Sequence, residues 1–215
     1  MKKLLIDAIS TSSGGAINHL SNILKNFNKQ NYFSEVDVYL PHQTKNLMPK
    51  IKKINYKSLK ILDKHLILRI FWQVIVLNII AFNKNYQCIF VTGSSHLIIK
   101  KPVITISQNL LPFNFFEVRK YFFSTFFFKL LLLRFTQTIS IRFSEGVIFL
   151  HKYSKKFLIQ KIGKIKGESK IIAHGVHGFK QCNFYKKKKY RLIYVSNIDY
   201  YKHQMFLLKN IDDFI

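Results

Sequence analysis

KLLIDAISTSSGGAINHLSNILKNF, residues 3–27, contains the structural unit from which this chain is built. Its first part, residues 3–9, is an apolar run of strand length that leads through serines and a threonine to Gly14-Gly15. After the glycines, apolar side chains recur as far as Phe27 at the spacing of one helix face. The stretch therefore predicts a strand, a glycine turn and a helix.

The same alternation of strand and helix continues along the chain. Further strands are predicted at residues 36–40, 51–56, 88–91, 102–107, 146–150 and 170–173. Helices are predicted at residues 59–82, 115–144 and 153–162. Strands that alternate with helices indicate a parallel sheet with helices on both faces. We therefore expect an α/β protein with a Rossmann-like parallel sheet.

The C-terminal part interrupts this alternation with a polar, basic stretch that includes the run Lys186 to Lys189. Such a run is typical of a solvated linker. We expect three regions: a Rossmann-like domain at 1–180, a basic linker at 181–189 and the start of a second, incomplete Rossmann-like unit at 190–215. The predicted pieces of that second unit are a strand, a loop and a helix start, at 190–195, 196–202 and 204–215.

Composition limits the classes of protein and partner. With 48% hydrophobic residues the chain is not intrinsically disordered. The two cysteines, Cys88 and Cys182, are too far apart and too few for a disulfide scaffold or a thiolate metal site. A formal charge of +25 indicates an anionic partner, and both nucleic acid and membrane phospholipid fit it. The short apolar run before Asp7 is no signal peptide, so we expect a cytoplasmic setting.

Two apolar segments are candidates for membrane spans. Residues 66–82 fall short of the roughly 20 apolar residues that a span needs. Lys129 and Arg134 interrupt residues 121–135, and a charge at mid-span costs about 2.5 to 3.5 kcal/mol. Neither segment is expected to cross a bilayer. For the second, two alternatives stay open: a helix in the headgroup plane of an anionic bilayer, or a helix packed against the sheet.

Few residues carry an explicit chemical pattern. Gly14-Gly15 at a helix start lets backbone N–H groups approach an anion, although a tight turn with close packing explains the pair equally well. The spacing is not that of a dinucleotide fingerprint or a P-loop. His174 and His177 have no acidic third ligand nearby, and no Gly-x-Ser-x-Gly elbow occurs. We expect no metal site, and no catalytic residue is assigned.

Five short motifs follow one another in order along nearly the whole chain. They are SSGGA at 12–16, SQNLLPF at 107–113, GVIFL with YSKK at 146–156, AHGV at 173–176 and YVSNIDYYKHQ at 194–204. In this order they resemble the N-terminal domain and the opening of the second domain of GT-B-type retaining glycosyltransferases, of the family 4 or group 1 kind. The resemblance implies a nucleotide-sugar donor, which is a substrate, and no cofactor. It also implies a lipid-linked glycan or a lipopolysaccharide or polysaccharide precursor as the acceptor.

The resemblance assigns donor-side roles to five residues. Gly14 and Gly15 match the loop beside the donor diphosphate. Lys202 falls on the lysine that neutralises this diphosphate, on which negative charge accumulates in the transition state. Ser196 and Asn197 stand where many members have Gly and Arg, so donor binding is expected to be weaker or differently arranged.

The acceptor side is matched by Gln108, Asn109 and Gly175. Gln108 stands where many members have a histidine that contacts the acceptor or the sugar, and its amide can hydrogen-bond a sugar hydroxyl. His174 replaces the usual Asn, and Gly175 keeps the turn. The basic charge is then expected to hold the protein on the inner face of the cytoplasmic membrane.

The family's pair of spaced glutamates in the donor domain has no counterpart before Ile215. We expect a truncated enzyme, with a separate second chain and an inactive fragment as alternatives. A non-catalytic remnant and a basic nucleic-acid-binding module are the competing functions. The latter is motivated by interleaved Tyr, Phe and Lys. No recognition motif supports it and most Phe residues lie in apolar runs, so nucleic acid is not expected as a partner.

Overall fold

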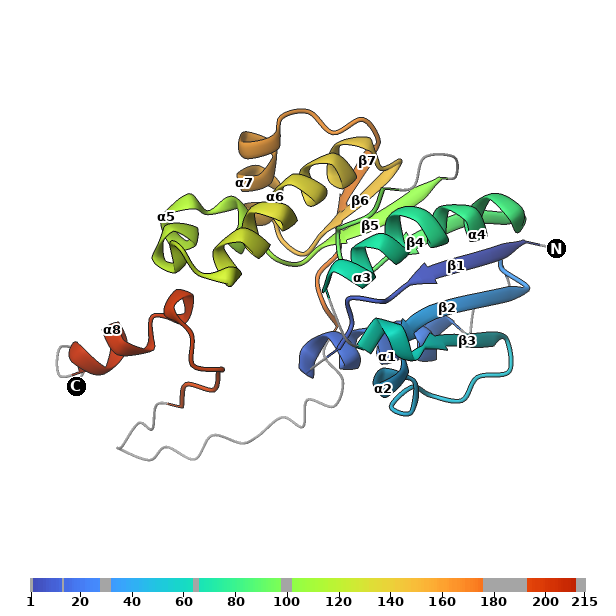
Figure 1. Cartoon of the computed structure of the whole chain (residues 1–215), viewed down its shortest axis with the longest axis horizontal. Helices are drawn as coiled ribbons and strands as arrows, with labels where there is room; N and C mark the ends of the chain where they lie inside the picture. The colour runs from blue at the N-terminus through green and yellow to red at the C-terminus, as the bar shows by residue number, and fades with distance from the viewer. Residues whose placement is uncertain are drawn as a thin grey trace, which may run out of the picture.

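The computed structural model describes residues 2–12, 14–27, 32–63, 66–97, 102–175 and 193–211. Its centre is a seven-stranded sheet in the order β3-β2-β1-β4-β5-β6-β7, in which every pair of neighbours is parallel (Figure 1). This confirms the predicted Rossmann-like α/β fold. The strands are β1 (Lys3–Asp7), β2 (Glu35–Pro41), β3 (Ile54–Leu59), β4 (Tyr86–Val91), β5 (Val103–Ser107), β6 (Gly146–Phe149) and β7 (Glu168–Ile171).

Helices connect the strands. Their bounds are α1 (Gly14–Phe27), α2 (His42–Lys45), α3 (Leu66–Phe71), α4 (Leu77–Asn83), α5 (Phe115–Val118), α6 (Thr125–Phe143) and α7 (Lys152–Ile162). Short segments add the 3-10 turns η1 (Lys60–Asp63), η3 (Leu111–Phe113) and η4 (Arg119–Tyr121) and the π-helical turn η2 (Trp72–Val76). None of the helices in the described part of the chain has the length and apolar character that crossing a bilayer requires.

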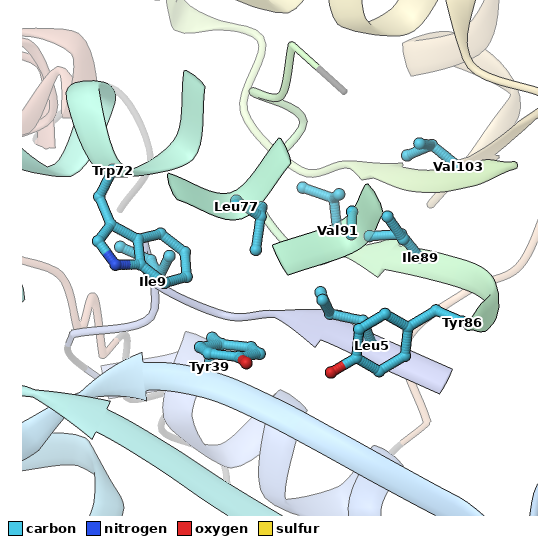
Figure 2. Packing of buried hydrophobic residues seen from close by; sticks show 10 residues of the cluster. Leu5, Ile9, Tyr39, Trp72, Leu77, Tyr86, Ile89, Val91 and Val103 are labelled. Atoms are coloured by element: carbon cyan, nitrogen blue, oxygen red, sulfur yellow. The ribbon is translucent and has the colours of Figure 1, made fainter. Parts of the chain in front are cut away.

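Both faces of the sheet are covered over β1, which explains the continuous apolar run at the start of the sequence. Because side chains alternate along a strand, Leu4 and Ile6 point to one face and Leu5 to the other. Leu4 and Ile6 pack with Leu20 and Leu24 of α1. On the opposite face, Leu5, Ile9, Val91 and Val103 pack under Trp72 and Leu77 of the η2–α4 segment (Figure 2). A third cluster joins α6 and α7 to β6.

The long helix predicted at 59–82 is divided. Residues 60–63 form η1, α3 begins at Leu66, and the π-helical turn η2 separates α3 from α4. The π turn inserts an extra residue per turn, and such turns occur frequently at functional sites. It coincides with two tertiary contacts, the buried Trp72 ring and a hydrogen bond from Gln73 to Asp7. Local helix propensity does not encode these contacts.

The helix predicted at 115–144 is also broken. After α5 and η4, Phe123 adopts a left-handed conformation with φ of 60°. Ser124 then begins a new helix, because its side-chain oxygen accepts a hydrogen bond from the Phe127 N–H at 3.1 Å. A serine that caps the backbone in this way competes with continuation of the preceding helix.

The C-terminal segment does not form the predicted strand in its described residues 193–195, and no neighbouring strand is there for them to pair with. The linker at 181–189 and residues 190–192 lie outside the described residues, and the second Rossmann-like unit stays a prediction. Beyond them come η5 (Tyr200–Lys202) and α8 (Gln204–Lys209). This segment contacts the α5–η4 region, where the Tyr121 hydroxyl donates to the Asp199 carboxylate.

Candidate functional site

A cavity of about 450 Å³ lies at the carboxyl ends of β1, β4 and β5. Chain connections run in opposite directions from β1 and from β4, so these neighbouring strands form the topological switch point of the sheet. Ligands of open α/β sheets bind in the crevice at such a point. We call this hollow the α3–α6 cavity, because Arg69 of α3 and Lys129 of α6 line it together with the loops after the three strands.

A second cavity, of about 760 Å³, lies beside α1 and is called the α1 cavity. It is lined by Gly15 and His19 of α1, by Gln108 after β5, and by His174 and Gly175 after β7. Three predicted site residues from distant parts of the sequence, Gly15, Gln108 and Gly175, therefore lie around one hollow. Gln108 and His19 line both cavities, so the two adjoin.

The glycine turn leaves the N-terminus of α1 open. Gly14 has φ of 50°, a left-handed conformation that disfavours any residue with a Cβ. A Cβ built on Gly14 or on Gly15 meets no atom within 4 Å, so nothing in the described residues crowds this helix end. The free N–H groups and the positive end of the helix dipole make it suitable for an anionic group.

His19 is a site residue that the sequence reasoning missed. Its ring meets the His174 ring edge-on, with centroids 4.2 Å apart. Burial, and secondly the neighbouring His174, lower the pKa of His19. The buried Nε2 of His19 has no hydrogen-bond partner within the described ranges. His19 comes four positions after Gly15, which places both on one helix face, and this spacing is the signal that could have identified it.

Asp7, at the end of β1, lies behind Gln73, which lines the α3–α6 cavity. Its Oδ1 accepts from the Ile9 N–H at 3.2 Å, and its Oδ2 accepts from Gln73 Nε2 at 2.9 Å. Burial raises the pKa of Asp7 to about 6. Gln73 lies in the π-helical turn and lines the cavity, so the turn holds a polar amide between the carboxylate and the hollow.

The α6 wall of the same cavity carries a buried polar network. The His96 N–H donates to Ser140 Oγ at 2.7 Å, and His96 Nε2 lies 2.8 Å from Ser144 Oγ. Burial lowers the pKa of His96 to about 4, so its ring is neutral at neutral pH. Gln137 is 4% exposed, and its Oε1 has no hydrogen-bond partner among the residues that the structure describes. A sugar hydroxyl both donates and accepts, so it suits such an amide.

The remaining predicted residues lie elsewhere or have local contacts. Asn109 lines the α3–α6 cavity, and its Oδ1 accepts from the Leu111 N–H at 3.0 Å. Ser196, Asn197 and Lys202 are in the C-terminal segment, and neither cavity is lined by them. The Lys202 ammonium lies 4.9 Å from the centroid of the Tyr201 ring. The structure thus does not bring these three residues to Gly14-Gly15.

Metal ligands do not cluster in the part of the chain that is described: no three His, Cys, Asp or Glu side chains gather there in a way that could hold an ion. The metal-free site stays a prediction, since residues such as His177 and Cys182 lie outside the described ranges.

The sequence matches no protein-family model and no curated protein. The structure is similar to the crystal structure of Anabaena Alr3699/HepE in complex with UDP-glucose, with a TM-score of 0.50 and 19% sequence identity. The similarity covers 82% of this chain and 44% of that protein, so this chain spans less than half of its length. At this identity the likeness shows the fold alone. It supports the Rossmann-like α/β fold described above.

Proposed function

We propose that this chain is the acceptor-side domain, with the start of the donor-side domain, of a retaining GT-B glycosyltransferase. The observation that carries this proposal is the meeting of Gly15, Gln108 and Gly175 around the α1 cavity, next to the switch point of the sheet. These are the places that the sequence resemblance connects with the donor and the acceptor. The protein of similar fold was crystallised with UDP-glucose, which agrees with a nucleotide-sugar donor.

The donor diphosphate would sit against the N-terminus of α1. Gly14 and Gly15 leave that helix end open, and the helix dipole favours negative charge there. Lys202, Ser196 and Asn197 would complete the diphosphate site from the donor side. This requires the C-terminal segment to leave its contact with Tyr121 and to face the α1 cavity.

The reaction we propose needs no metal and no nucleophile from the protein. The acceptor hydroxyl oxygen forms the bond to the anomeric carbon while the bond from that carbon to the diphosphate oxygen breaks. The hydroxyl proton passes to the departing diphosphate oxygen, and the new bond forms on the same face of the sugar. Gln108, whose amide lines both cavities, would hydrogen-bond a sugar hydroxyl.

The acceptor in this proposal is a lipid-linked glycan or a lipopolysaccharide or polysaccharide precursor. Such acceptors place the protein on the inner face of the cytoplasmic membrane. The charge of +25 supports this location, because each Lys or Arg close to an anionic leaflet contributes about 1 kcal/mol.

Nucleotide-sugar binding tests the proposed site. We expect UDP-, GDP-, CMP- or dTDP-sugars to raise the melting temperature of the chain, because a ligand that binds only the folded state stabilises it. Gly15→Leu should abolish this rise without lowering the melting temperature of the free protein, since a Cβ at Gly15 meets nothing within 4 Å. Gln160→Leu on the exposed side of α7 is the matched control. An equal rise in melting temperature of the Gly15→Leu variant would contradict a donor site at the N-terminus of α1.

A further inference from the structure

The turn between η4 and α6 and the outer side of α6 present a continuous apolar surface. Phe128, Leu131, Leu132 and Phe135 recur at helical spacing on α6, and all are exposed. Phe122 and Phe123 precede them at the turn, where Phe123 is 86% exposed. We call these six residues the aromatic face.

Ring contacts make the turn and the helix one surface. The centroids of Phe122 and Phe123 lie 4.5 Å apart, those of Phe122 and Phe127 5.0 Å, and those of Phe127 and Phe128 5.6 Å. Figure 1 shows α5 and the first half of α6 extending past the carboxyl ends of the strands. The aromatic face therefore lies at the end of the molecule that carries the cavities.

The most exposed ring is held at the tip by an unfavourable backbone. Phe123 has φ of 60°, a conformation that is rare for a bulky residue. Strained residues of this kind cluster at functional sites, where surrounding structure holds them in place. Here the strain directs an aromatic ring into solvent, where it contributes nothing to the core.

The charges around the aromatic face have one predominant sign. Arg119, Lys120, Lys129 and Arg134 lie between residues 115 and 135, against the single acid Glu117. Glu117 is itself paired, because Lys120 Nζ lies 2.8 Å from its Oε2. Apolar rings flanked by cations match the two layers of an anionic bilayer, with hydrocarbon beneath phosphate.

We propose that the aromatic face inserts into an anionic lipid bilayer, with Phe122 and Phe123 deepest and the flanking Lys and Arg side chains at the phosphate level. The α3–α6 cavity opens beside this contact, because Lys129 and Leu132 line the cavity as well. A phosphate-bearing acceptor in the membrane would then enter between Arg69 and Lys129. This entry route rests on the proposed transferase function, whereas the membrane contact itself does not.

Sedimentation with vesicles tests the membrane contact. We expect the full chain to bind vesicles of mixed phosphatidylglycerol and phosphatidylcholine, and to bind pure phosphatidylcholine far more weakly. The double variant Phe122→Ser, Phe123→Asn should lower the partition coefficient about tenfold or more, since two large apolar side chains no longer insert. An asparagine accepts the left-handed conformation at position 123, so the turn keeps its shape.

Phe143→Ser is the control, because Phe143 lies at the opposite end of α6 from the turn and is 61% exposed, against 58% for Phe122. The Phe143→Ser variant should bind vesicles with the same partition coefficient as the unchanged protein. Equal binding by the double variant, or indifference of the unchanged protein to anionic vesicles, would overturn the proposal. So would a dimer, seen by light scattering, that the double variant dissociates, since the occupant would then be a second copy. Loss of vesicle binding with an intact response to nucleotide sugars would leave the proposed function standing.

Discussion

Replacing Asp7 by asparagine is expected to change how the stability of this protein depends on pH. Asp7 is 1% exposed, and its carboxylate accepts hydrogen bonds from the Ile9 N–H and the Gln73 amide, both of which are neutral groups. Burial raises its pKa from 3.8 to about 6. The folded protein therefore holds a proton on Asp7 at pH 5, whereas the unfolded chain has released it.

The sign and size of the effect follow from this difference. A raised carboxyl pKa stabilises the fold at low pH, and this stabilisation is lost as the pH rises from about 4 through about 6. A shift of about 2 units corresponds to about 3 kcal/mol of unfolding free energy. The asparagine of the Asp7→Asn variant would carry no charge at any pH, and its amide can keep both hydrogen bonds if the Gln73 amide turns over.

Urea unfolding of both proteins at pH 4, 5, 6 and 7 measures the effect. We expect the stability of the Asp7→Asn variant relative to the unchanged protein to increase by about 3 kcal/mol between pH 4 and pH 7. Asp37→Asn is a control of opposite sign. Burial opposes ionisation of Asp37, but hydrogen bonds from Tyr86 and Asn55 and the charge of Lys84 hold its pKa below the ordinary value. A relative stability of Asp7→Asn that does not change with pH would refute the reasoning.

Three further predictions concern the helix ends and the histidine pair. Gly14→Ala should lower the free energy of unfolding by about 1 kcal/mol, because φ of 50° is unfavourable with a Cβ, and Gly14→Asn should lower it less. Ser124→Ala should lower the free energy of unfolding by about 1 kcal/mol, because the Phe127 N–H loses its cap. Thermal unfolding measures this loss, and the Ser124→Thr control should largely keep the stability of the unchanged protein. His174→Ala should raise the pKa of His19 in a proton NMR titration, and only in part, because burial is the larger cause. An unchanged or lower pKa would contradict this contact.

The centre of the sheet was predictable because nearly every residue of β1, β2 and β5 is buried. In β1, the successive residues Leu4, Leu5 and Ile6 are all buried, so the run is apolar on both faces without any knowledge of its neighbours. The π-helical turn was not predictable, since it depends on Gln73 reaching Asp7 across 66 residues of sequence. Of the strand predicted at 190–195, the described residues 193–195 do not form a strand for a related reason: an extended segment becomes a strand only beside another one.

Some residues of the candidate site were also predictable from the sequence, and others were not. Gly15, Gln108 and Gly175 were identified from the sequence through the family resemblance, and each follows the carboxyl end of a strand or begins the next helix. Arg69 and Lys129 were not, because only the folded arrangement of α3 and α6 brings them to a common cavity. His19 was predictable only in part. Its spacing from Gly15 was visible, but its contact with His174 depends on the fold.

Binding of labelled nucleotide sugars is the most direct test of the central claim. The chain would be equilibrated with one labelled nucleotide sugar at a time, because the proposed acceptor-side domain and the start of the donor-side domain hold part of the donor site. We predict saturable binding that disappears in the Gly15→Leu variant, while Gln160→Leu retains it. Absence of binding of every donor, together with no rise in melting temperature and tight, salt-sensitive oligonucleotide binding, would contradict the account.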